Sequence, residues 1–208
     1  EHGDKVISEV TIAQAYGGAR GVKCIVTETS ALDPMEGIRF RGMTIPDLQK
    51  KLPKAPGGEE PLPEGLFYLL LTGDMPTEAD VLEVQNEWKK RGDLPGYLIE
   101  VLKAIPKGTH PMTQFCMAIL ALQKDSIFAQ QYRDGMNKMD YWDPMYEDTM
   151  NLLAKLPKIA AYIYRKEYKG DKHIPSDPNL DWGGNMAHML GVEGDAFKEL
   201  MRLYLTIH

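Results

Sequence analysis

The chain lacks several features that mark whole classes of protein. It has only two cysteines in 208 residues, Cys24 and Cys116, and no CxxC or Cys/His spacing, so no metal site is expected. Both lie in apolar segments and are expected to be reduced core thiols. Since 24 Lys and Arg face 30 Asp and Glu, the net charge is −6 and nucleic acid is not an expected partner. The longest dense apolar run, residues 66–71, is far shorter than the ~20 residues of a membrane helix, so no membrane span is expected.

A complete catalytic motif is also missing. The chain contains no GxSxG, no HExxH, no cysteine with a matched histidine motif and no convincing carboxylate pair, so we expect no catalytic residue in it. What is present fits a globular fold: 43% of the residues are hydrophobic, enough for one sizeable core. No repeat and no domain boundary is expected, and residues 53–61, rich in Pro and Gly, read as an ordered loop between helices.

Strand-like patterns are confined to the first part of the chain, residues 6–41. Short apolar runs occur at Val10 with Ile12 and at residues 24–26, and Ile38 and Phe40 alternate with arginines. The turn residues at 33–37 predict a small hairpin ending in the last run.

Everything after Thr44 is predicted to be helical. Thr77, followed three residues later by an acid, starts a helix that buries Val81, Val84 and Trp88 and stops at Gly92. Residues 110–122 leave little polar surface and predict a central helix inside the core. A long helix follows from about residue 143 to 170, and a final one begins near Asp195 and is still running at the last residue.

The segment Tyr-Gly-Gly-Ala-Arg-Gly at 16–21 combines three glycines with a guanidinium. Backbone N–H groups there can approach an anion closely, and the Arg20 guanidinium can bind a phosphate through two hydrogen bonds. Neither the P-loop nor the GxGxxG pattern is present, so the residues alone favour a tight turn with a surface arginine over a phosphate site.

The remaining polar candidates have ordinary structural interpretations. Arg39 and Arg41 alternate on one strand and read as a solvated or ion-paired edge, and Lys138 is unremarkable by itself. His110 and His188 read as capping or packing residues and His173 as a loop residue. His208 lies on an apolar stripe, where a histidine must be hydrogen-bonded or face a polar cavity.

Long stretches of the chain resemble the amino-terminal half of citrate synthase of the mitochondrial type. The resemblance spans essentially the whole chain, in the order found in the family. Its main stretches are residues 16–21, 27–30, 32–34, 36–42, 57–67, 110–112, 141–142, 153–157, 180–182, 185, 189–191 and 200–208.

The resemblance implies an all-α fold with a small β-hairpin near the N-terminus. Residues 1–208 would form part of the large domain, with the C-terminal remainder and the small domain outside this chain. The intact protein would be an acyltransferase, a homodimer in the mitochondrial matrix. It would condense acetyl-CoA with oxaloacetate to citrate and CoA, the entry step of the tricarboxylic acid cycle, with no permanently bound cofactor. Two alternatives stay open: a 2-methylcitrate synthase, and an inactive structural or filament-forming homologue.

The family's catalytic histidines and aspartate come after the end of this chain, which therefore lacks the catalytic residues. Arg20 matches a family arginine that contacts CoA phosphate. Lys138 occupies the position of an arginine that, in some members, reaches the CoA of the partner subunit. A lysine keeps the positive charge but lacks the planar guanidinium that can bind a phosphate through two hydrogen bonds. His208 begins the family's histidine-rich segment, so the resemblance implies that it lies close to the substrate and takes no part in the chemistry.

Overall fold

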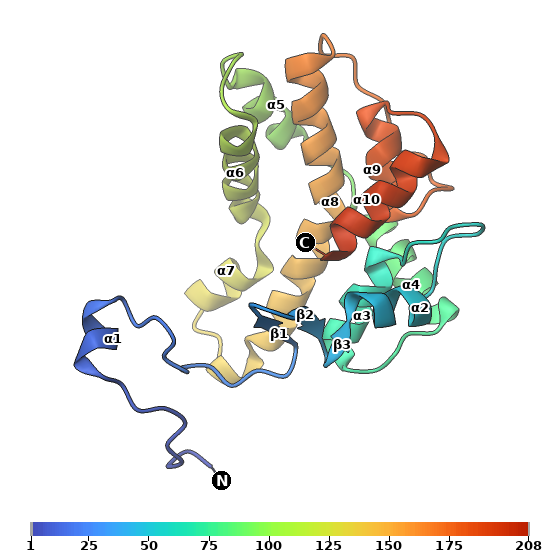
Figure 1. Cartoon of the computed structure of the whole chain (residues 1–208). Helices are drawn as coiled ribbons and strands as arrows, with labels where there is room; N and C mark the ends of the chain where they lie inside the picture. Colours follow the sequence, from blue (N-terminus) through green and yellow to red (C-terminus); the bar gives the residue numbers. More distant parts are fainter. Residues whose placement is uncertain (1, 208) are drawn as a thin grey trace. The chain divides into compact units, whose positions relative to one another are not determined.

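The computed structural model describes residues 2–207, which form a mainly helical fold with one small antiparallel sheet, as the sequence predicts (Figure 1). The chain divides into two compact units, one ending at Ile45 and one beginning at Pro46. Whether these units belong to one large domain stays a prediction. The elements are α1 (Ile12–Tyr16), β1 (Ser30–Asp33), β2 (Gly37–Phe40), β3 (Met43–Thr44), α2 (Ile45–Lys51), α3 (Pro63–Thr72), α4 (Glu78–Arg91), α5 (Gly96–Ala104), α6 (Pro111–Leu122), α7 (Ile127–Arg133), α8 (Trp142–Tyr168), α9 (Trp182–Leu190) and α10 (Asp195–Ile207), with short 3₁₀ turns η1 (Gln123–Asp125) and η2 (Lys138–Asp140).

The predicted hairpin is confirmed in the first unit. Asp33 ends β1, and its Oδ1 accepts hydrogen bonds from the N–H groups of Met35 and Glu36 at 2.8 and 2.9 Å, which closes the turn. Gly37 then starts β2 with φ of 90°, a conformation that favours glycine. β2 pairs with β1 on one side and with β3 on the other, so the strand order is β1-β2-β3.

The other strand predictions are wrong. Ile12 begins α1, because Thr11 and Gln14 form a capping box that starts a helix there. Residues 24–26 form no strand, and Cys24 is exposed instead of lying in a core. The three apolar residues pair with no strand of the sheet, whose order is β1-β2-β3, and a strand forms only with a hydrogen-bonded partner.

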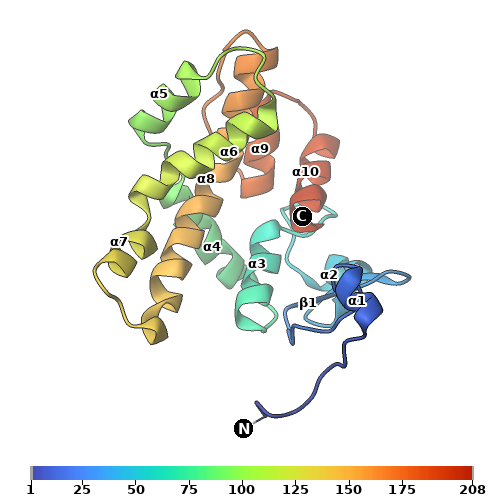
Figure 2. The same ribbon diagram turned by 90° about the vertical axis from the view of Figure 1, so that its left-hand side faces the viewer.

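Helix α8 is the centre of the second unit (Figures 1 and 2). It contacts α4, α6, α7 and α9 along its length. On one side Ile159 and Ile163 of α8 pack with Leu98 and Leu102 of α5. On another side, Met150 and Ala154 pack with Trp88 of α4. The second unit is therefore built around two apolar clusters that share α8.

The helix starts that carry capping signals are confirmed. Thr77 and Asp80 form a capping box at the start of α4, and Val81, Val84 and Trp88 are buried. The final helix begins at Asp195 as predicted. The sequence predicted helical structure after Thr44 but no individual helix at α5, α7 or α9.

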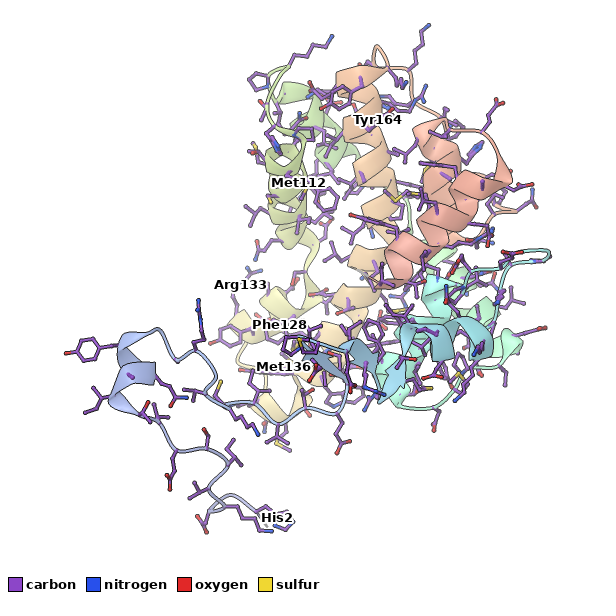
Figure 3. The ribbon with its side chains drawn as sticks, in the orientation of Figure 1. His2, Met112, Phe128, Arg133, Met136 and Tyr164 are labelled. Atoms are coloured by element: carbon purple, nitrogen blue, oxygen red, sulfur yellow. The ribbon has the colours of Figure 1, made fainter. Side chains whose placement is uncertain are left out.

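The prediction that residues 110–122 form a helix inside the core is wrong in part. The helix is present as α6, but only Gln114 and Ala118 are buried in it. Met112, labelled in Figure 3, is 59% exposed and Leu120 is 73% exposed. Cys116 is exposed as well, so neither cysteine is a core thiol. The reason is that α6 packs on α5 and α8 with one face, and these exposed side chains lie away from that face.

In the part of the chain that the structure describes, every helix is too short or too polar to cross a bilayer.

Candidate functional site

The glycine-rich segment with Arg20 forms a tight turn directly after α1. Gly18, Ala19 and Gly21 have φ values of 76°, 59° and 76°, so three of four consecutive residues adopt the left-handed conformation. The Ala19 N–H donates to the Gln14 carbonyl at 2.8 Å, and the Val22 N–H donates to Ala19 at 3.1 Å, which fixes the turn. The Arg20 side chain is exposed and has no hydrogen bond or ion pair within residues 2–207. The turn thus presents Arg20 to solvent on an ordered frame, the arrangement a phosphate contact requires.

Lys138 lies in the second unit, at the first position of η2. The Asn137 side chain accepts a hydrogen bond from the Met139 N–H at 2.9 Å and so starts this turn. Tyr141 follows η2 and holds its end in place, because the ring of Tyr141 packs edge to face on the ring of Phe128, labelled in Figure 3, with the ring centroids 5.1 Å apart. The Lys138 ammonium itself is exposed. Arg20 and Lys138 belong to different units, and the CoA contacts of both stay predictions.

The candidate histidines lie in different settings. His208 lies outside the described residues. His110 caps α6 as expected, since its Nδ1 accepts from the Met112 N–H at 3.2 Å. His173 is a loop residue, as predicted, paired with Asp171 at 2.8 Å and stacked on the ring of Tyr162. His188 is half-buried on α9.

Arg39 is ion-paired, as the sequence suggested. Its guanidinium lies 2.9 Å from the Glu36 carboxylate and also donates to the Gly42 carbonyl. Residues 2–207 contain no group of three or more His, Cys, Asp or Glu side chains arranged to hold a metal ion.

A buried network of charges in the second unit was not predicted from the sequence. The guanidinium of Arg202, on α10, donates to both carboxylate oxygens of Asp181 at 3.2 and 2.6 Å, and it also pairs with Glu199. Asp181 in turn caps α9 through the Gly184 N–H at 2.9 Å. Burial, the largest influence, raises the pKa of Asp181, but the hydrogen bonds from Arg202 and Gly184 hold it below 3.8 overall.

The same network explains why two glycines open α9. A Cβ on Gly183 would approach the Cγ of Arg202 to 3.0 Å, and one on Gly184 would lie 2.9 Å from Asp181 Oδ2. Glycine is required here because α10 packs against the first turn of α9 with no room for a side chain. Consecutive glycines ordinarily argue against a helix, which is why this one was missed.

Glu64 is a fully buried carboxyl group on α3. Its Oε1 accepts a hydrogen bond from the Trp182 N–H at 3.0 Å, and its Oε2 has no partner in the described chain. Burial raises the pKa of Glu64 from 4.5 to about 7, although the Trp182 hydrogen bond lowers it in part. A carboxyl group at this position titrates in the neutral range.

Stability should therefore fall as the pH rises through neutrality. The folded-state pKa of Glu64 lies above the unfolded value, so its contribution is complete below 4.5 and is lost as the pH rises through about 7. The loss should be roughly 3 kcal/mol, which the Glu64→Gln variant should largely lack. Urea unfolding of both proteins at about pH 5 and about pH 8 checks this. An equal loss in both would contradict it.

Comparison with known proteins places the chain in a family. Residues 18–208 match the family model described as "Citrate synthase, C-terminal domain". The chain belongs to the citrate synthase family. It is 57% identical to the mitochondrial citrate synthase of Aspergillus niger and 52% identical to that of Saccharomyces cerevisiae, in both cases over 100% of this chain. It spans 44% and 43% of those two proteins, less than half of each. Which part of a whole citrate synthase it represents stays a prediction.

Solved structures agree on the fold. Citrate synthase from Pyrobaculum aerophilum superimposes with a TM-score of 0.77 at 23% identity, covering 98% of this chain and 50% of that one. Citrate synthase from Thermoplasma acidophilum, solved as a ternary complex with carboxymethyl coenzyme A and oxaloacetate, gives 0.71 at 17% identity and covers 96% of this chain and 47% of that one. The mainly helical citrate synthase fold is therefore confirmed.

Proposed function

We propose that the intact protein is a citrate synthase, an acyltransferase that condenses acetyl-CoA with oxaloacetate to give citrate and CoA. The observation that carries this is the 57% identity to a mitochondrial citrate synthase over the full length of the chain. The names of its relatives also support a mitochondrial location, and within the organelle we propose the matrix, where the tricarboxylic acid cycle runs.

In this function the chain would bind substrate and leave the reaction to groups elsewhere in the protein. The condensation needs an enolate stabilised by hydrogen bonds and a base at the acetyl methyl. We place neither role on a residue of this chain. The exposed guanidinium of Arg20, on its fixed turn, is suited to the CoA phosphates, and Lys138 offers a second, more flexible charge. His208 is proposed to lie near the substrate.

We also propose a homodimer. The support is the uncovered apolar face of α6, where Met112, Met117 and Leu120 are exposed in the chain as described. A second subunit would cover such a face, because exposed apolar side chains of this size favour association.

The assay that tests the function measures CoA release by the intact protein from acetyl-CoA and oxaloacetate, with propionyl-CoA as the competing acyl donor. We expect acetyl-CoA to be preferred. Preference for propionyl-CoA would identify a 2-methylcitrate synthase. No turnover with either acyl donor would support the alternative of an inactive structural homologue.

Arg20→Ala should raise the KM for acetyl-CoA about tenfold and leave kcat and the KM for oxaloacetate nearly unchanged. The reason is that a phosphate contact remote from the reacting atoms contributes equally to binding the ground state and the transition state. Lys138→Ala should act in the same direction but more weakly. Steady-state kinetics with each substrate varied measures both. A large fall in kcat at unchanged KM in Arg20→Ala would refute the assignment.

A further inference from the structure

A groove of about 320 Å³ lies beside the C-terminal half of α8, where Tyr164 is labelled in Figure 3. It is bounded by α8, by the end of α9 and by the connection between these helices, residues 169–181. Its volume falls within the range of roughly 300–1,000 Å³ that is typical of small-molecule sites. Its apolar walls come from Leu94, Ala161, Ile174, Pro175 and Met189.

Arg165, on α8, lines this groove and is held in place by backbone carbonyl groups. Its Nε donates to the Lys172 carbonyl, and its Nη1 donates to the Leu190 carbonyl at 3.0 Å. A Cβ at Gly191, which ends α9 with φ of 78°, would collide with Nη1, so the guanidinium lies directly against the backbone there. The guanidinium is therefore oriented before a ligand arrives, which lowers the cost of binding.

The third nitrogen of this guanidinium is available. Arg165 Nη2 makes no hydrogen bond within residues 2–207, and it is not one of the fully buried atoms of that part of the chain that lack a partner. A ligand can therefore reach it, and its N–H groups gain a partner when an acceptor binds.

The charges at the groove favour an anion. A hydrogen bond from Lys158 at 2.8 Å holds the pKa of Asp93 below 3.8, so this pair is ionised and its charges cancel. His173 lines the groove as well and is paired with Asp171. Arg165 contacts only neutral carbonyl oxygens and forms no ion pair within residues 2–207, so its positive charge has no counter-ion there.

We propose that this groove binds a small organic monocarboxylate. The carboxylate accepts a charge-assisted hydrogen bond from Arg165 Nη2, and the non-polar part of the ligand lies against Ile174 and Met189. A doubly charged phosphate ester fits less well, because more charge must leave water for a groove with mostly apolar walls. The site uses neither Arg20 nor Lys138 and does not depend on the proposed function.

Calorimetric titration of the intact protein with benzoate, benzamide and phenyl phosphate tests the proposal. Benzoate and benzamide share shape and size, but only benzoate is charged at neutral pH. We expect benzoate to bind about tenfold more tightly than benzamide and also more tightly than phenyl phosphate.

Variants locate the effect. Arg165→Met keeps much of the arginine stem and should lower the affinity for benzoate about tenfold without changing that for benzamide. Arg133→Met, which removes an exposed arginine of α7 labelled in Figure 3, should change neither affinity.

The proposal is overturned if benzoate and benzamide bind alike, if neither binds, if phenyl phosphate binds best, or if Arg165→Met binds benzoate normally. If Arg165→Met does not fold, Lys158→Met decides instead. Its loss removes a positive charge from the groove and leaves Asp93 unpaired, so the affinity for benzoate should fall about threefold, and an unchanged affinity overturns the proposal.

Discussion

Arg202→Met should lower the free energy of unfolding by about 3–5 kcal/mol, since it leaves the buried carboxylate of Asp181 without its cation. Methionine fills much of the space of the arginine stem, so the effect measures the lost charge more than a lost volume. Urea unfolding of the two proteins at neutral pH gives the value directly.

The matched control lies on the same helix. Lys198→Met removes a pair with Asp195 at the surface of α10 and should change stability by less than about 0.5 kcal/mol. The difference between the unmodified protein and Arg202→Met should also shrink at low pH. The folded-state pKa of Asp181 lies below 3.8, so the stability it contributes is present above that pH and lost below it. A difference that stays constant down to about pH 3 would contradict the role given to Asp181.

Lys166→Met should cost a similar amount, about 3–4 kcal/mol, for a different reason. The Lys166 ammonium, 7% exposed on α8, donates to the carbonyls of Leu102 and Ile105 at 2.7 and 2.9 Å and reaches Gln114 at 3.3 Å. It therefore caps the end of α5 and ties α5, α6 and α8 together. Without it, two backbone carbonyls in the core lose their donor.

Lys103→Met is the control for this variant. Lys103 is an exposed lysine on α5 that pairs with Glu100 at the surface, and its loss should be nearly neutral. Thermal and urea unfolding should agree on the ranking of the two variants. A loss below about 1 kcal/mol in Lys166→Met would show that solvent or a neighbouring group replaces the ammonium.

The features that the sequence predicted correctly are local ones. The hairpin depends on Asp33 and Gly37, four residues apart, and the start of α4 depends on Thr77 and Asp80. Capping and turn chemistry act over three or four residues, so their signals can be read without a structure. Helix α9 was missed because Gly183 is explained by the close approach of Arg202, about 20 residues later.

Burial was predicted less well than helices, for a physical reason. An apolar pattern marks the residues that avoid water but does not say what covers them, and α6 shows this because several of its apolar side chains, among them Met112, Met117 and Leu120, are exposed. Glu64 and Lys166 present the opposite case, since charged residues are expected at the surface and their partners lie far away in the sequence. Of the candidate site residues, Arg20 and Lys138 came from the family resemblance. The buried network of Arg202, Asp181 and Glu199 carried no sequence signal.

The hydrogen bonds between α10 and the segment before α3 affect the order in which the chain folds during synthesis. The Glu199 carboxylate accepts from the N–H groups of Glu59 and Glu60, and Thr206 donates to the Pro61 carbonyl, across separations of 140, 139 and 145 residues. A ribosome adds roughly 5–20 residues per second, so the backbone groups of residues 59–61 lack these hydrogen-bond partners for many seconds after they are synthesised. The segment around Pro61 is therefore among the last to reach its final environment, and the nascent chain is open to chaperones there until α10 has emerged.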